Sequence, residues 1–387
     1  MNERPENRLI LCIARSRSNA DQMRRLVQQP LNWDYLFATA SAHGLLPLLH
    51  KHLSTVADLI PPQSRQHLKR GSVSNTQAVL HLAGKQLRVL KLFGEHKVPA
   101  AILKGSVLSQ MAYGEIALRQ AGDIDMLIHR RDFERARSLL ESLGYEMFPK
   151  LTAAQLASHL HHHCEISFMR DDWFTVIDLH WELAPKSFVF NLDVDEVMSR
   201  LQTISVAGTS VETFGAEDSV LYQSMHGAKH LWRRLEWIVA LAETLQGCSI
   251  DWDSLVLRAQ GTRMTRMLAL GLRLAGEFGG VPIPSRVLDT IDADKAMGQL
   301  SAKIRVNIFS ISGPADSTET NLYNLRIMDR KRDAIVSALR AIFVPTFTDW
   351  QAVALPESLH SLYYAVRPLR LSKVYGGSLL RRVTRNA

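Results

Sequence analysis

Residues 120–129, QAGDIDMLIH, decide the fold of this chain. Asp123 and Asp125 flank a single isoleucine where the chain enters the apolar run Met-Leu-Ile. Alternate side chains of a strand share a face, so the two carboxylates point the same way, roughly 6–7 Å apart along the chain. Carboxylates this close repel each other, and the pattern therefore predicts a cation beside a strand at 124–129.

A third carboxylate lies in the stretch VIDLHW, residues 176–181. In a strand at 173–183, Asp178 and His180 share one face, while the other face is apolar. An ionised carboxylate on a buried strand needs a partner. If the strands at 124–129 and 173–183 are neighbours in one sheet, Asp178 meets the two earlier aspartates. Three carboxylates suit Mg²⁺ (or Mn²⁺), held together with substrate phosphates.

The stretch ILKGS, residues 102–106, supplies the second half of the pattern. It leaves a strand at 98–103 and enters a helix through Gly105 and Ser106. Backbone N–H groups at a helix start bind anions, and glycine lets a phosphate approach the backbone closely. Lys104 adds a positive charge beside them, so this turn is predicted to bind a phosphate group.

This order of strand, KGS, helix, GDID and strand, followed by the carboxylate of IDLHW, resembles the nucleotidyltransferase superfamily of the DNA polymerase β type. The chain is more closely similar to an uncharacterised bacterial nucleotidyltransferase family that has LKG, GDID and DLHW motifs. The resemblance extends over residues 30–375, in which 32–53 match the first helices of that family and 362–371 its closing segment.

The resemblance implies transfer of a nucleoside monophosphate from an NTP, with ATP expected, to an acceptor. Pyrophosphate would be released by a two-metal mechanism. It implies that Asp123 and Asp125 ligate the metal and that Asp178 ligates metal and helps to deprotonate the acceptor. Gly105 and Ser106 would then hold the triphosphate.

Other polar residues near these motifs are further candidates for the site. Arg119 is expected either to contact the carboxylates or a phosphate, or to lie on the surface. His180 shares the face of Asp178, and it either orients a ligand or acceptor or has a structural role. An acid that often follows the LxW segment in the similar family is replaced here by Ala240.

A basic helix face is predicted within the helical stretch 216–245, because its residues recur at helical spacing. Lys229 and His226 on this face are expected to bind the nucleotide, although a solvated face is the alternative. The nearby Trp232 and Trp237 are expected to belong to the core rather than to stack on a base. The face consists of His226, Lys229, His230 and Arg233.

A histidine cluster at 159–163 raises the hypothesis of a zinc site, which the pattern disfavours. The only nearby thiol is the adjacent Cys164, no second ligand pair is spaced for zinc, and strand alternation separates His162 from His161 and His163. One of these histidines contacting substrate is the alternative. The full set is His159, His161, His162 and His163.

Composition describes an ordinary globular protein of 387 residues, 46% hydrophobic and 22% charged. No apolar run is long enough to span a bilayer, and the charged N-terminal stretch is unlike a secretion signal. Three widely separated cysteines indicate neither a disulfide framework nor a thiolate zinc site, so the cytoplasm is the expected location. Six of the net +8 charges lie in residues 364–387, where a solvated, partly disordered tail is expected.

The predicted fold class is α+β, a small mixed β-sheet of nucleotidyltransferase type flanked by helical N- and C-terminal regions. Further strands are expected at 161–169 and 173–183, joined by a tight RDD turn, with single long helices at 216–245 and 252–280. The expected divisions are a helical region at 1–95, the core at 96–185, a mostly helical region at 186–363 and a basic tail at 364–387.

The acceptor is not identified by any motif, and both a small molecule and a protein hydroxyl remain open. Nucleic acid is possible through the basic tail but is not favoured. A non-catalytic nucleotide- or RNA-binding protein of the same fold is the alternative to an enzyme.

Overall fold

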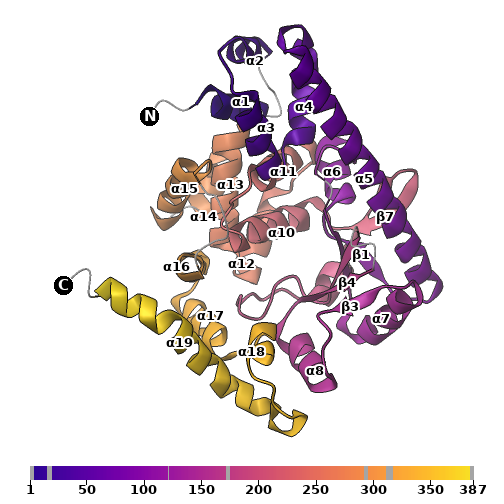
Figure 1. Cartoon of the computed structure of the whole chain (residues 1–387), viewed down its shortest axis with the longest axis vertical. Coiled ribbons are helices and arrows are strands. Elements are labelled where there is room, and N and C mark those ends of the chain that lie inside the picture. The colour runs from indigo at the N-terminus through magenta and orange to yellow at the C-terminus, as the bar shows by residue number, and fades with distance from the viewer. Residues whose placement is uncertain are drawn as a thin grey trace.

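A mixed sheet of seven strands, in the order β3-β4-β5-β2-β1-β7-β6, forms the centre of the fold (Figure 1). The computed structural model describes residues 4–14, 20–120, 122–170, 175–291, 295–310 and 317–383. The strands are β1 (Ala100–Ile102), β2 (Ile124–Ile128), β3 (Glu146–Phe148), β4 (Glu165–Met169), β5 (Val176–His180), β6 (Gln202–Val206) and β7 (Thr209–Thr213).

Two parallel pairings join strands that are distant in sequence. β2 pairs with β5, which sets Asp125 opposite Asp178, and β1 pairs with β7 through Ile102 and Thr213. The Thr213 hydroxyl donates to the Ile102 carbonyl oxygen at 2.7 Å, which adds a side-chain contact to this short pairing. The remaining neighbours pair antiparallel. The predicted mixed sheet is confirmed, and it also includes strands beyond residue 185.

The predicted hairpin of β4 and β5 is confirmed by their antiparallel register, although most of its RDD turn, 171–172, lies outside the described residues. Its first strand is shorter than the predicted 161–169, because residues 161–162 end a helix that starts with a capping box at Thr152. The reciprocal hydrogen bonds of Thr152 and Gln155 satisfy the first backbone donors of this helix, and local helix formation therefore prevails there.

The N-terminal region is helical, as predicted. Pro62 begins the longest of the described helices, since proline is tolerated in a first helical turn. This helix, α5, runs along one side of the molecule past the sheet (Figure 1). The region comprises α1 (Pro5–Ile13), α2 (Ala20–Val27), α3 (Trp33–Ala42), α4 (Leu46–Leu53), the 3₁₀ helix η1 (Ser54–Leu59) and α5 (Pro62–Glu95).

Short helices separate the strands of the sheet. Gly114 ends the first of them in a left-handed conformation, with φ at +71°, which glycine adopts without steric cost. These elements are α6 (Ser106–Tyr113), η2 (Arg130–Asp132), α7 (Phe133–Ser142), α8 (Ala153–His162) and α9 (Val194–Met198).

The C-terminal region is mostly helical. Among the described residues, no helix is both long and apolar enough to cross a membrane. The helices are α10 (Ala216–Lys229), α11 (Leu235–Gly247), α12 (Trp252–Thr262), α13 (Thr265–Gly279), α14 (Ser285–Ile291), α15 (Lys295–Asn307), α16 (Ser317–Ile327), α17 (Lys331–Phe343), α18 (Phe347–Ala352), η3 (Glu357–Leu362) and α19 (Tyr363–Val383).

The two long helices predicted at 216–245 and 252–280 are each broken, so these predictions are wrong. α10 ends before a tight corner in which Leu231 and Trp232 have φ values of 57° and 51°. Arg263 separates α12 from α13, also with a left-handed φ of 63°. The Trp232 side chain is fully buried against α10, so packing of a large side chain favours the corner over a continuous helix.

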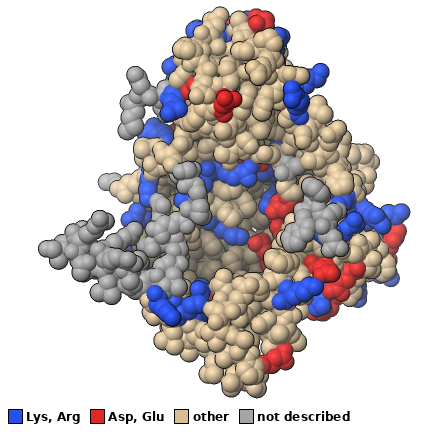
Figure 2. All heavy atoms as spheres, viewed as in Figure 1, with Lys and Arg blue, Asp and Glu red and all other residues tan. Residues whose placement is uncertain are grey.

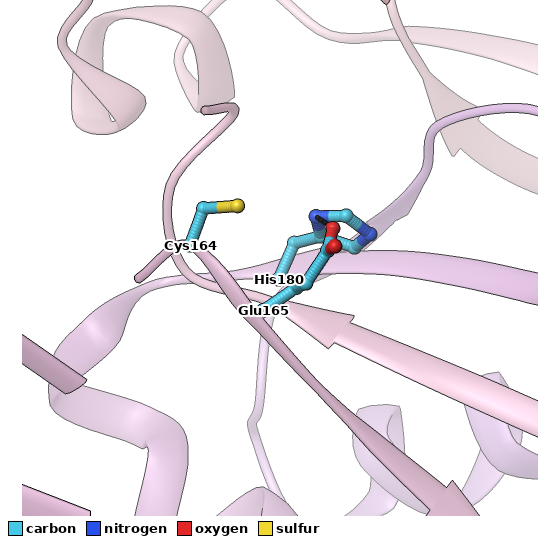
Figure 3. Close-up of side chains that lie close together, drawn as sticks. All are labelled: Cys164, Glu165 and His180. Atoms are coloured by element: carbon cyan, nitrogen blue, oxygen red, sulfur yellow. Dashed lines mark ion pairs between the residues drawn. The ribbon is translucent and has the colours of Figure 1, made fainter. Parts of the chain in front are cut away.

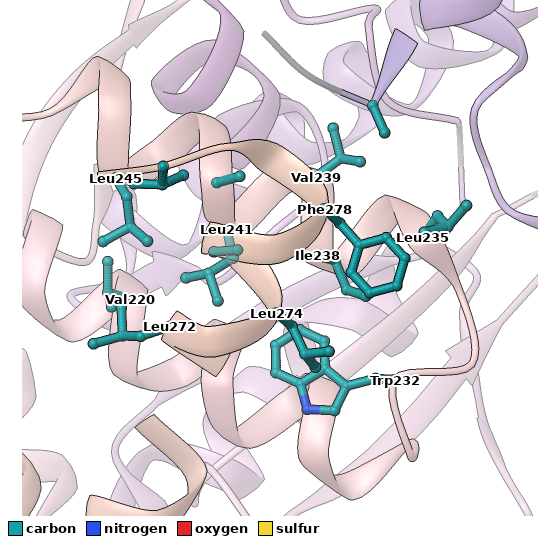
Figure 4. Packing of buried hydrophobic residues seen from close by; sticks show 14 of the residues in the cluster. Val220, Trp232, Leu235, Ile238, Val239, Leu241, Leu245, Leu272, Leu274 and Phe278 are labelled. Atoms are coloured by element: carbon teal, nitrogen blue, oxygen red, sulfur yellow. The ribbon is translucent and has the colours of Figure 1, made fainter. Parts of the chain in front are cut away.

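Two apolar clusters stabilise the fold. One packs the apolar face of β2 and β5, including Met126, Ile177 and Leu179, against Phe93 of α5 and Phe133 of α7. The other fills the space among α10, α11 and α13, where Trp232, Ile238 and Phe278 meet (Figure 4). The opposite face of β2 and β5, which carries the aspartates, is therefore left for the site.

The basic C-terminal segment is not a solvated tail in its described part. It forms α19 up to Val383, and Arg367 and Arg370 donate to the fully buried Asp349 at 2.8 and 2.5 Å. Burial alone raises the pKa of Asp349, but the bonds from the two arginines outweigh it and lower that pKa to about 2. Two of the tail's charges therefore anchor the helix, and the prediction of a solvated tail is wrong for these residues.

Candidate active site

The three predicted aspartates meet at one edge of the sheet. Asp123 immediately precedes β2, Asp125 lies on β2 and Asp178 lies on β5. One carboxylate oxygen from each lies within 4.8 Å of the others, which is close enough for a shared cation. The Ser167 hydroxyl of β4 donates to Asp178 at 2.6 Å and fixes the orientation of that carboxylate.

Lys104 is the cation that the structure places beside these carboxylates. Its Nζ atom lies 3.1 Å from Asp125 and 3.4 Å from Asp123. Burial lowers the pKa of Lys104, but the two carboxylates outweigh that effect and raise it. Lys104 was predicted to bind phosphate, and here it neutralises two of the aspartates.

Asp178 has no ion pair with a cation among the described residues, unlike Asp123 and Asp125. Burial, together with the neighbouring Asp125 and Asp123, raises the pKa of Asp178 to about 7, although the Ser167 hydrogen bond opposes the rise. Burial also opposes ionisation of Asp123, but Lys104 holds its pKa below the ordinary value. Asp123 and Asp178 therefore differ in basicity, and Asp178 is the stronger base of the two.

His180 connects the aspartates to a second group of ligating side chains. Its ring nitrogens lie 3.2 Å from Asp125 and 3.1 Å from Glu165, and Glu165 lies 3.8 Å from Lys229. Burial lowers the pKa of His180, but its bond to Asp125, with help from Cys164 and Glu165, raises it to about 10. The imidazolium thus fixes both carboxylates by charge.

Cys164, Glu165 and His180 point toward one another (Figure 3), and their sulfur, oxygen and nitrogen ligand atoms lie within 4.8 Å. His180 thereby joins this group to the aspartates. The prediction left His180 either to orient a ligand or to serve a structural role, and the geometry places it against the proposed ligand Asp125.

Gly105 forms the turn into α6 and lines the cleft. Its φ of +70° and ψ of −132° lie in a region that L side chains rarely adopt, which explains why glycine stands there. Ser106 begins the helix, but its hydroxyl donates to Gln86 of α5 at 3.2 Å. The Ser106 side chain is thus not among those lining the cleft, and its backbone N–H at the helix start is the group left for an anion.

A cleft of about 350 Å³ opens in front of the aspartates. Figure 2 shows that the viewed face is hollowed near its centre and that Lys and Arg side chains gather around the hollow. The predicted residues Arg119, His226 and Lys229 all line the cleft, together with His180 and the three aspartates. Segments from α6, β2, β5, α10 and α11 therefore contribute side chains to one space.

Arg119 does not lie on the surface, so that alternative is wrong. It is 9% exposed and pairs with Glu236 of α11 at 2.9 Å, rather than with the aspartates. Arg234 lies 3.0 Å from the other oxygen of Glu236. Glu236 is itself buried, so this ion pair positions two guanidinium groups at the cleft wall.

Aromatic rings form a further part of the cleft wall. Trp237 is half-buried and lines the cleft, whereas Trp232 is fully buried in the core as predicted. His226 and His230 lie 5.4 and 5.3 Å from the Trp237 ring, measured between centroids. Trp237 also packs against the core, so the prediction of a core residue describes only one side of its ring.

The histidine cluster lies away from this cleft. His159 bonds the Glu165 carbonyl oxygen at 2.8 Å, and His162 bonds the hydroxyl of Tyr364 on α19 at 2.6 Å. His163 stacks on His159 with 4.3 Å between ring centroids. None of these described histidines lines the cleft or belongs to a metal-sized cluster of ligand atoms.

Among the cleft residues that sequence reasoning missed are Glu165, Arg234, Glu236 and Tyr222. Glu165 stands beside a cysteine in an alternating strand, where a carboxylate is an ordinary solvent-facing residue. Only the pairing of β4 with β5, which sets Glu165 opposite His180, reveals its place. Arg234 and Glu236 lie in the stretch RRLEWI, residues 233–238, whose place at the cleft depends on the corner that precedes it.

The carboxylates on adjacent parallel strands, the glycine turn and the basic cleft occur in a segment that matches a family model described as uncharacterised nucleotidyltransferase, over residues 29–280. The chain belongs to that family. This nucleotidyltransferase therefore has an NTP as its substrate class, and its acidic cluster is suited to a divalent metal.

Two solved structures are similar at low identity. The antibiotic-resistance factor ANT(2'')-Ia is 14% identical, with 61% of this chain and 94% of that chain covered and a TM-score of 0.26. A nucleotidyltransferase-like protein from Paracoccidioides brasiliensis is 13% identical, with 56% and 93% covered and a TM-score of 0.33. No curated protein matches the chain. With scores this low, the family assignment rests on the family model.

Proposed function

We propose that this nucleotidyltransferase transfers a nucleoside monophosphate, with ATP the expected donor, to a hydroxyl group of an acceptor and releases pyrophosphate. The observation that carries the proposal is the register of β2 and β5, which sets Asp125 opposite Asp178 with Asp123 beside them. The acceptor oxygen forms a bond to the α-phosphorus as the bond to the β-phosphate oxygen breaks.

Asp123, Asp125 and Asp178 are the proposed ligands for Mg²⁺ or Mn²⁺. Their donor set fits these ions, since all three offer oxygen, and Oδ2 of Asp125 is buried without a hydrogen-bond partner in the described structure. Two divalent ions bound there would neutralise charge on the attacking and leaving oxygens. Ser167 and His180 hold two of the ligands in place.

The triphosphate is proposed to bind at the start of α6. Gly105 allows close approach to backbone N–H groups there, including that of Ser106. Lys229 and His226 of α10 face the same cleft, and Arg119 lies on its wall. Lys104 lies beside the aspartates in the same cleft. It is therefore placed to interact with both the aspartates and the phosphates when a triphosphate is bound.

Asp178 is the proposed base for the acceptor hydroxyl. Without a bound ion, burial and the neighbouring carboxylates raise its pKa to about 7, whereas Lys104 keeps that of Asp123 low, so Asp178 accepts a proton more readily than Asp123 does. Ser167 fixes one of its oxygens, so the other is the one available to the acceptor.

The test uses ATP, GTP, CTP and UTP labelled on the α-phosphate, with Mg²⁺ and a mixture of candidate acceptors. We expect label transfer and pyrophosphate release, lowered at least about 100-fold by Asp123→Asn, as befits loss of a group acting in the transition state. Asp253→Asn is the matched control, since Asp253 is exposed, pairs with Arg286 and is not among the residues that line the cleft. Equal activity in the Asp123 variant, or RNA binding without any turnover, would reject the proposal.

A further inference from the structure

A second cavity adjoins the catalytic cleft and differs from it in chemistry. It also measures about 350 Å³, and Leu183, Tyr222 and Met225 line both cavities. The two spaces are therefore neighbours separated by only a few side chains. One wall of the second cavity is the segment that follows β5, the strand of Asp178.

Most of the residues that line the second cavity have apolar side chains. Twelve of its sixteen lining residues have apolar or aromatic side chains and four are charged, whereas nine of the twenty-two residues that line the catalytic cleft are Asp, Glu, Lys or Arg. The aromatic groups include Phe188, Phe190 and Phe214, and the first two rings lie 5.8 Å apart between centroids. Transfer of an apolar molecule from water into such a space is favourable, because it removes apolar surface from water.

Two of the four charged residues that line this cavity are engaged by contacts with other residues. Asp218 is bound by Arg200 at 2.6 Å and by Arg258 at 2.9 Å, so its charge is already satisfied. The Arg340 guanidinium donates to the backbone oxygen of Lys186. The glycine turn, Lys104 and Lys229, by contrast, all belong to the neighbouring cleft. A triphosphate is thus better accommodated in the cleft, and the apolar cavity is left for the other substrate.

We infer that the acceptor is a small molecule with an aromatic or aliphatic body that carries a hydroxyl group. The body occupies the apolar cavity, and the hydroxyl reaches past Tyr222 and Met225 into the catalytic cleft. This inference rests on the proposed function and names its acceptor class. In the reaction, the acceptor O–H oxygen bonds to the α-phosphorus, its proton passes to Asp178, and pyrophosphate leaves with the electrons of the broken bond.

A cavity of this size favours a free small molecule over a hydroxyl on a protein surface. Its volume lies at the lower end of the range for ligand sites, roughly 300–1,000 Å³. The half-buried rings of Phe188 and Phe190 restrict the space on the side of the 186–192 segment. A protein tyrosine could offer the same phenol, so the experiment must distinguish the two sources.

The test measures label transfer from α-phosphate-labelled NTP to 2-naphthol and 3-phenylpropan-1-ol, compared with glucose and kanamycin. We expect at least about tenfold higher kcat/KM for the apolar alcohols, which corresponds to about 1.4 kcal/mol. Phe188→Ala with Phe190→Ala is expected to raise KM for the apolar alcohol at least about tenfold and to leave KM for the NTP within about twofold. Phe148→Ala, an exposed residue of β3, is the matched control.

Several outcomes separate this inference from the proposed function. Transfer only to glucose, kanamycin or an added protein would overturn the inference while supporting nucleotidyl transfer. Unchanged KM for the alcohol in the double variant would also overturn it. If no acceptor is turned over, quenching of 2-naphthol fluorescence on binding decides the question: saturable binding weakened by the double variant supports the cavity, and absence of binding rejects it. Absence of NTP binding in a separate titration would count against the proposed function.

Discussion

Asp125 and Asp178 are register partners on two parallel strands, so a carboxylate from each faces the same space. The strands are separated by the whole segment of β3 and β4 in sequence, yet they are neighbours in the sheet. The register places both acids on the face opposite the apolar core. The fold therefore holds two negatively charged groups close together when no metal ion is bound. The predictions below follow from this arrangement and from the groups around it.

Mg²⁺ is expected to stabilise the folded protein. An ion that binds only the native state at 100 times its dissociation constant adds about 2.7 kcal/mol to the free energy of unfolding. Urea unfolding with and without Mg²⁺ measures this difference. Asp178→Asn should lose most of the gain, whereas Asp253→Asn should retain it. The same gain in both variants would contradict an ion at the aspartates.

Lys104→Met is expected to destabilise the protein when Mg²⁺ is absent. It removes the only described lysine that pairs with Asp123 and Asp125 and leaves the buried Asp125 charge less compensated. We expect the free energy of unfolding to fall by about 3 kcal/mol, with part of it restored by Mg²⁺. Lys150→Met is the control: Lys150 is 82% exposed in its pair with Glu146, so its substitution should leave the free energy of unfolding nearly unchanged.

Anchoring of α19 is expected to weaken in acid. The folded pKa of Asp349 is about 2, below its ordinary 3.8, so the arginine pairs stabilise the fold fully above pH 3.8 and lose that effect as the pH falls toward 2. The loss is about 2 kcal/mol from the two pKa values. Wild type should therefore lose about that much more unfolding free energy between pH 5 and pH 2 than Asp349→Asn does. Parallel pH curves for the two proteins would refute this role.

Trp237→Ala is expected to raise KM for the NTP by about tenfold, because stacking of a base on an aromatic ring contributes roughly 1–3 kcal/mol. Trp237→Phe keeps a ring at the cleft wall and should recover most of the affinity. Initial rates at varied NTP concentration give both values. A similar rise in both variants would indicate that the indole packs the core without touching the base.

The residues that were predicted from sequence are those whose role is fixed by local pattern. Strand alternation alone places Asp125 and Asp178 on polar faces, and the glycine at 105 marks a turn that only glycine adopts easily. These signals need no knowledge of distant segments. The neighbouring relationship of β2 and β5 was a condition of the prediction, and the structure fulfils it.

The features that escaped prediction depend on contacts between distant segments. The corner at Leu231 and Trp232 uses left-handed backbone that these residues rarely adopt, and only the packing of the indole against α10 compensates for it. β6 and β7 are polar on their exposed positions and resemble a surface loop until β7 pairs with β1. Trp237 contacts both the core and the cleft, and the helical periodicity of the sequence predicts only the contact with the core.

The pairing of β1 with β7 also bears on how the protein is made. A nascent chain that has emerged only to residue 185 has β1 without its outer neighbour, and the backbone groups of that edge are free to pair with another chain. Once the segment through Thr213 has left the ribosome, β7 covers β1 and the short strand β6 becomes the edge on that side. A fragment ending at 185 should therefore self-associate during expression, whereas one extended past 213 should remain dispersed.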